Sequence, residues 1–90
     1  MHAYTIMFRD GGFSDGYNAP SPRMAALQHI SDIIGCAVPD SDEGCREMVS
    51  SYVRYCEADG DLPAEFSVVS DSTPGILYSF DDLRKDLSLS

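Results

Sequence analysis

The segment from Asp40 to Gly60 constrains the fold of this chain more than any other, because its apolar residues recur at helical spacing. These residues fall at positions i, i+3, i+4, i+7, i+8 and i+11, and they are Cys45, Met48, Val49, Tyr52, Val53 and Cys56. Asp40, with Glu43 three residues later, has the form of a capping box, and Gly60 is a natural stop. Gly44 in the first turn costs about 1 kcal/mol relative to alanine. The pattern predicts a helix with one apolar stripe, which must be buried against another element.

Three further segments have the composition of β-strands. Residues 3–9 alternate large apolar side chains with smaller ones and are rich in β-branched and aromatic residues, which predicts a strand. Residues 65–70 and 76–80 are separated by a turn that contains Pro74-Gly75, so they are expected to form an antiparallel hairpin. Residues 13–19 follow a glycine-rich turn, and we expect either a short return strand or an ordered loop there.

The remaining signals are those of helices. Ser21-Pro22 is a helix start and Gly35 is a helix end, which predicts a helix over 22–34. Ser79 or Asp81 is suited to cap a short C-terminal helix that runs to Leu87. The order is therefore β-α-α-β-β with this short helix at the end. A chain of 90 residues suffices for one core, so we expect a single α+β domain over 1–90, with an antiparallel sheet of about three strands packed against two helices.

The charge of the chain excludes several classes of function. The net charge is −9, and residues 40–65 hold eight acids against two bases. The six Lys and Arg residues are scattered, so direct binding of nucleic acid is not expected. No apolar run approaches the roughly 20 residues that cross a bilayer, and the N-terminus lacks the pattern of a signal peptide. We expect a cytoplasmic protein with no membrane association.

The histidines and cysteines do not match a catalytic or metal-binding motif. Cys36, Cys45 and Cys56 are spaced as neither a disulfide framework nor a zinc module, so we expect reduced cysteines packed in the core. His29 is expected to be a partly exposed residue of the first helix. The acids of 57–61 do not complete a calcium loop. The glycine-rich turn after the first strand lacks the lysine of a phosphate-binding loop. We therefore expect no cofactor, no metal and no enzymatic activity.

Part of the acidic charge lies where stability alone does not explain it, and the alternative to a binding role is that this charge only keeps the protein soluble and monomeric. Asp42 and Glu43 favour the helix dipole at the start of the second helix, whereas Glu57 and Asp59 lie at its unfavourable end. On the helix face opposite the apolar stripe, Glu47 projects outward with Glu43, which suits a basic protein partner. Phe13 and Tyr17 in the glycine-rich loop are candidate apolar anchors, with burial under the sheet as the equal alternative. The expected partner-binding residues are Asp42, Glu43, Glu47, Glu57, Asp59, Asp61, Phe13 and Tyr17.

In size, acidity and intracellular character the chain resembles the small acidic phage-encoded inhibitors of bacterial defence, of the anti-CRISPR and anti-restriction type. The resemblance implies a stoichiometric inhibitor that occupies a basic nucleic-acid-binding surface of a defence complex in the host cytoplasm. Two alternatives remain open. An antitoxin-like or regulatory module would neutralise a basic partner through the same face, and a small enzyme would depend on a single His or Cys. The protein is expected to be a monomer or a homodimer, with Tyr55 either at a dimer contact or against the sheet.

Overall fold

The computed structural model of this protein describes residues 2–9, 11–13, 16–60, 64–73, 75 and 77–89. In chain order its elements are β1 (His2–Phe8), β2 (Tyr17–Ala19), α1 (Pro22–Ile34), α2 (Asp42–Asp59), β3 (Phe66–Ser70), β4 (Leu77–Ser79) and α3 (Phe80–Asp86). The predicted α+β class is confirmed. The sheet has four strands rather than about three, because residues 17–19 form the return strand instead of a loop.

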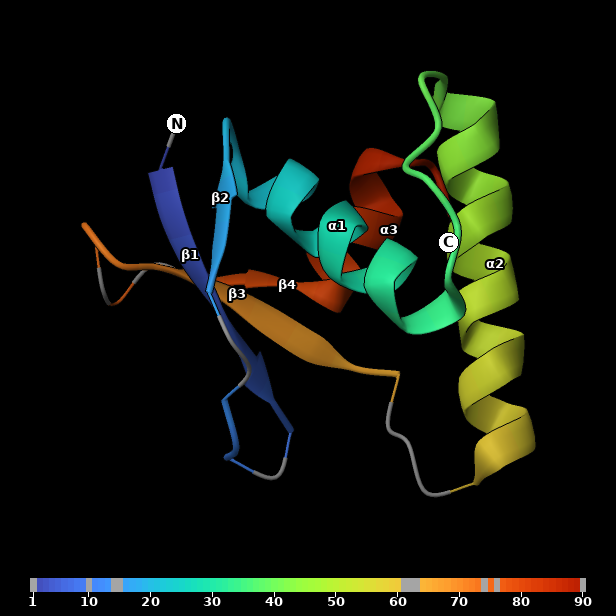
Figure 1. The fold of residues 1–90 in the computed structure, drawn as a ribbon, viewed down its shortest axis with the longest axis horizontal. Helices are drawn as coiled ribbons and strands as arrows, with labels where there is room; N and C mark the ends of the chain where they lie inside the picture. The colour runs from blue at the N-terminus through green and yellow to red at the C-terminus, as the bar shows by residue number, and fades with distance from the viewer. Residues whose placement is uncertain are drawn as a thin grey trace.

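The four strands form one antiparallel sheet in the order β2-β1-β3-β4. All three helices lie on the same side of this sheet, and α1 lies between the sheet and α2 (Figure 1). The hairpin of β3 and β4 is confirmed, with Val68 opposite Tyr78. Its second strand ends at Ser79 rather than at Phe80, because Ser79 caps α3. Ile76, where this strand was expected to begin, lies outside the described residues.

Helix α1 has the bounds that its capping residues predict. The Ser21 hydroxyl accepts a hydrogen bond from the Met24 backbone N–H at 3.2 Å, and Gly35 ends the helix at φ +74°. Because α1 is covered on two sides, its buried surface is wider than its row of large apolar residues. The buried residues are Ala25, Ala26, Leu27, His29 and Ile30.

Helix α2 begins one residue later than the predicted capping box implies. Ser41, not Asp40, is the capping residue, and its hydroxyl accepts from the Gly44 backbone N–H at 3.0 Å. Gly44 is also required by packing, since a Cβ at this position would lie 2.6 Å from the Cβ of Pro39. Gly60 ends the helix at φ +76°, as predicted.

The core lies between the sheet and the helices and is centred on three aromatic rings. Tyr52 of α2 packs edge-on against Phe66 and Phe80, at centroid distances of 6.2 and 5.7 Å. The Tyr52 hydroxyl donates a hydrogen bond to the Ala64 carbonyl at 2.7 Å, so its buried polar atom is satisfied. These contacts fix α2 relative to the sheet. Within the described residues, no helix has the length and apolarity required to cross a bilayer.

Candidate functional site

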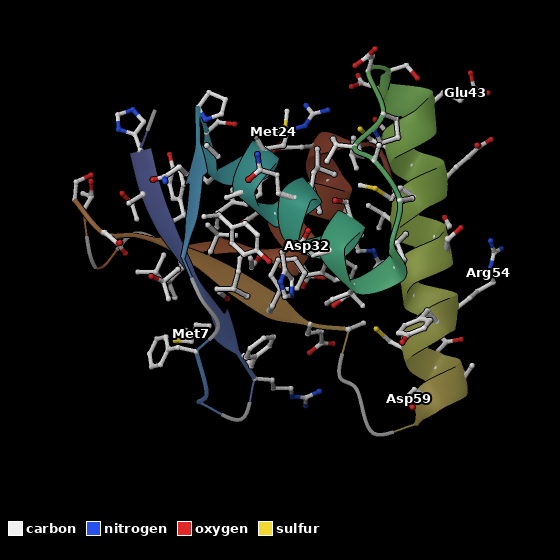
Figure 2. All side chains as sticks on the ribbon, viewed as in Figure 1. Met7, Met24, Asp32, Glu43, Arg54 and Asp59 are labelled. Carbon is white, nitrogen blue, oxygen red and sulfur yellow. The ribbon has the colours of Figure 1, made fainter. Side chains whose placement is uncertain are left out.

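The outer face of α2 gathers three of the predicted acids. Glu43, Glu47 and Glu57 are exposed, and at about 3.6 residues per turn they fall on one side of the helix, over a length of about 21 Å. We call these three residues the acidic stripe. Figure 2 shows Glu43 and Arg54, which lies on the same side, pointing away from the body of the protein. The buried side of α2 is held by Tyr52 and its neighbours, so the stripe lies on a fixed support.

The charge of the acidic stripe is not compensated within the described part of the chain. The ion pairs found there join Arg9 to Glu65, Arg23 to Asp42 and Arg84 to Asp81. The Arg54 guanidinium donates instead to the Ser51 hydroxyl, at 3.3 Å. The stripe is therefore a net negative surface whose neighbouring bases are Arg54 and Arg46, and Arg46 donates to the Leu87 carbonyl at 3.4 Å.

The other predicted acids have different surroundings. Asp42 accepts a hydrogen bond from the Arg23 guanidinium of α1 at 2.7 Å, and this bond raises the pKa of Arg23. Asp42 therefore joins the start of α2 to α1, and its charge is matched. Asp59 is exposed at the last position of α2 and lies on a different side of the helix from Glu43. Asp61 lies outside the described residues.

The two predicted aromatic anchors lie apart from the acidic stripe. Phe13 is 66 % exposed and forms a β-bridge with Met7, so it lies on the face of the sheet that no helix covers. Figure 2 shows Met7 pointing away from the helices. Tyr17 is half-buried on the helix side of the sheet, where its hydroxyl donates to the Asp32 carboxylate at 2.9 Å. One flat partner surface therefore does not contact both Phe13 and the acidic stripe.

His29 is buried, with 4 % of its surface exposed, which corrects the expectation of a partly exposed residue. Its ring packs against Phe8 and Phe66 at centroid distances of 5.6 and 4.8 Å, and its Nδ1 lies 3.4 Å from the Tyr17 hydroxyl. Its Nε2 is buried and has no hydrogen-bond partner among the described residues. Burial lowers the pKa of His29 to about 4, against the opposing effect of Asp32. At neutral pH His29 is thus an uncharged core residue.

The cysteines are free thiols in two kinds of environment. Cys45 and Cys56 are buried as expected, and burial raises the pKa of both. The Cys45 thiol donates to the Pro39 carbonyl at 3.6 Å. Cys36 is exposed, which corrects the expectation that all three are packed, because it follows the end of α1 and belongs to no helix or strand. Among the described residues, no three His, Cys, Asp or Glu side chains are grouped so that they could hold a metal ion.

A feature that sequence reasoning missed is a hollow of about 250 Å³ at one end of the sheet. Its lining includes Met7, Ser67 and Ser79, whose side chains share the uncovered face, together with the Arg9–Glu65 ion pair at 3.2 Å. The alternation of residues 3–9 was the available signal, but alternation does not tell which side of a sheet the helices leave open. No family model, curated protein or solved structure matches this chain.

Proposed function

We propose that this protein is an inhibitor that binds a basic, nucleic-acid-binding surface of a bacterial defence complex through the acidic stripe of α2. The observation that carries the proposal is the row of Glu43, Glu47 and Glu57 on one exposed helix face, with no ion pair to any of them in the described residues. Such a face attracts Lys and Arg side chains and speeds association with a basic protein.

The position of Glu57 supports a role in binding rather than in stability. It lies in the last turn of α2, a turn that contains no basic residue. Negative charge at a helix C-terminus is unfavourable by roughly a few tenths of a kcal/mol. Glu43 at the first turn is favoured by the same dipole, so the dipole explains one end of the stripe and not the other.

The rigidity of α2 supports competition with nucleic acid. Ser41 and Gly60 fix its ends, and Tyr52 anchors its middle through a hydrogen bond of 2.7 Å. A helix backbone that is held in place loses little conformational entropy on binding, so the ordering cost falls on the exposed Glu side chains. Glu43 and Glu47 lie about 6 Å apart along the axis and Glu57 about 15 Å beyond Glu47, with Arg54 on the same side between them. The stripe thus offers a partner unevenly spaced negative charges over about 21 Å. The protein would act in the cytoplasm of the host cell.

The proposal is tested by capture from bacterial lysates that contain CRISPR and restriction systems, at about 50 mM and about 500 mM salt. We expect recovery of a nuclease or surveillance-complex subunit at low salt, its loss at high salt, and its displacement by added duplex DNA. Recovery of a basic toxin that DNA does not displace would instead identify an antitoxin-like module. If no partner were bound at either salt, the proposal would be wrong.

Two variants distinguish the effect of the acidic stripe on binding from the effect of net charge. The first reverses the stripe with Glu43→Lys, Glu47→Lys and Glu57→Lys. The second reverses three exposed acids outside α2 with Glu65→Lys, Asp71→Lys and Asp81→Lys. It changes the net charge equally and in addition breaks the Arg9–Glu65 and Arg84–Asp81 ion pairs, which makes it the more demanding control. We expect capture to be lost with the first variant and kept with the second. Equal loss with both would mean that net charge, rather than the face of α2, governs binding.

A further inference from the structure

One face of the sheet is not covered by any helix (Figure 1). Because strand side chains alternate between faces, the pairing register determines which residues form it. Thr5, Val69 and Leu77 form one row across three strands, and Met7, Ser67 and Ser79 form the next. Phe13 pairs with Met7 and extends that second row. Ala3, Asn18 and Asp71 form a third row beside Thr5. We call this surface the outer sheet face, and it consists of Ala3, Thr5, Met7, Phe13, Asn18, Ser67, Val69, Asp71, Leu77 and Ser79.

The outer sheet face concentrates exposed apolar side chains. Within the described part of the chain, the large hydrophobic residues that stay exposed are Phe13 at 66 %, Leu77 at 49 % and Tyr55 at 49 %. Two of these three lie on the outer sheet face, beside the half-buried side chains of Met7 and Val69. Exposed apolar residues that gather on one face, rather than being scattered, mark an interaction surface.

The charge distribution identifies a second copy of this chain as the occupant. The chain carries a net charge of −9, yet among the described residues the outer sheet face holds a single charged side chain, Asp71, whose carboxylate accepts from the Thr5 hydroxyl at 3.0 Å. The Arg9–Glu65 pair at its end is internally neutral, with its charged atoms 3.2 Å apart. The acidic stripe lies on the other side of the molecule, beyond α1 (Figure 1). Two copies that meet face to face therefore hold their acidic stripes far apart, and the carboxylates that the described residues bring near the contact are Asp71 beside Thr5 and, at the hollow, Asp81 and the paired Glu65.

The shape of the outer sheet face is suited to a symmetric contact. In a two-fold dimer the same patch must complement itself. The outer sheet face carries both a protruding ring, Phe13, and the hollow of about 250 Å³ that Met7, Ser67 and Ser79 line. An aromatic residue seated in a pocket of the partner is a common anchor of protein interfaces.

We propose that two copies of this chain associate through their outer sheet faces, with the two sheets packed about 10 Å apart. Four strands and the seven residues of β1 span at most about 19 by 23 Å. Two such footprints bury roughly 900 Å², below the roughly 1,200 Å² at which stable interfaces begin. The dimer is accordingly weak and forms at high concentration.

Sedimentation velocity tests this at about 20 µM and about 1 mM protein, each at about 50 mM and about 500 mM salt. We expect the dimer fraction to rise with concentration and also with salt, because salt screens the repulsion between two acidic chains. Binding through the acidic stripe has the opposite salt dependence, so the two proposals fail independently. A monomer at about 1 mM protein in both salts would overturn the dimer.

A matched pair of variants locates the contact. Leu77→Lys places a charge within a row of the outer sheet face, and Tyr55→Lys places the same charge on α2 at an equally exposed position. We expect the first to weaken dimerisation at least 10-fold and the second to leave it unchanged. The reverse pattern would place the interface on α2 and overturn the proposal.

If Leu77→Lys does not fold, amide NMR spectra of the wild-type protein locate the dimer contact instead. Between low and high protein concentration, we expect the shifts to change in β1, β3 and β4 and to stay constant along the acidic stripe. Changes confined to α2 would contradict the proposal.

Discussion

Lowering the pH from 7 to 5 is expected to destabilise this protein through His29. In the folded protein its pKa is about 4, and in the unfolded chain it returns to about 6.5. The unfolded state therefore binds the proton more readily, so the free energy of unfolding is fully retained above pH 6.5 and falls as the pH drops toward 4. A pKa difference of about 2.5 units corresponds to at most about 3 kcal/mol, of which about 2 kcal/mol is lost by pH 5.

The cause of this effect is the packing around the imidazole. Phe8 and Phe66 contact the ring, and its Nε2 has no hydrogen-bond acceptor in the described residues. The titratable groups beside it are the Tyr17 hydroxyl, 3.4 Å from Nδ1, and the Asp32 carboxylate, which accepts a hydrogen bond from Tyr17. A proton added at Nε2 would be buried without a partner, which the fold resists.

Urea denaturation at pH 7 and pH 5 measures the effect, with His29→Leu as the reference. The leucine variant retains every other titrating group, so the difference in pH dependence between the two proteins isolates His29. We expect the wild type to lose about 2 kcal/mol more than the variant over this interval. Equal losses, or an imidazole that titrates near 6.5 by NMR in the folded protein, would refute the reasoning.

Three substitutions test the packing and the caps, each by the midpoint of urea unfolding. Gly44→Ala should destabilise the protein by about 1 kcal/mol or more, because the new Cβ would lie 2.6 Å from the Cβ of Pro39. Helix propensity alone favours alanine, so a higher midpoint would show that the segment containing Pro39 moves aside without cost. Ser79→Ala should cost about 1 kcal/mol through loss of the α3 cap, and no change would mean that the cap is replaced by water. Tyr52→Phe should cost about 1 kcal/mol because the Ala64 carbonyl loses its donor, and an unchanged midpoint would contradict that contact.

The helices could be predicted from the sequence because their ends carry strong local signals. Ser21, Pro22 and Gly35 bound α1 as expected, since each acts through its own backbone or its immediate neighbours. The cap of α2 could not be assigned in this way, because Asp40 and Ser41 are both good capping residues. Pro39 also approaches Gly44 so closely that a Cβ would not fit there, and this packing at the start of α2 is not visible in helix propensities.

The burial of His29 depends on tertiary packing, which no local sequence pattern around this residue indicates. Its helix lies between the sheet and α2, so positions beyond the row of large apolar residues are also buried. Ala25 and Ala26 allow this close approach, but alanine occurs on buried and exposed helix faces alike. The sequence pattern therefore showed which side of α1 is most apolar, without showing that a second side is covered.

The candidate site was partly predictable for the same reason. Helical periodicity places Glu43, Glu47 and Glu57 on one side of α2, and this depends only on spacing. That Arg23 neutralises Asp42 depends on how α1 meets α2. That Phe13 lies away from the acidic stripe depends on which face of the sheet the helices cover. Both facts come from the packing of elements that are distant in sequence.

The central claim is that the acidic stripe binds a basic partner. Its most direct test is the affinity of the wild type, the stripe reversal and the control reversal for the captured subunit, measured by calorimetry at two salt concentrations. The account predicts that the stripe reversal abolishes binding, while the control reversal and the wild type bind alike at low salt and weaken together at high salt. Binding that survives reversal of Glu43, Glu47 and Glu57 would contradict it.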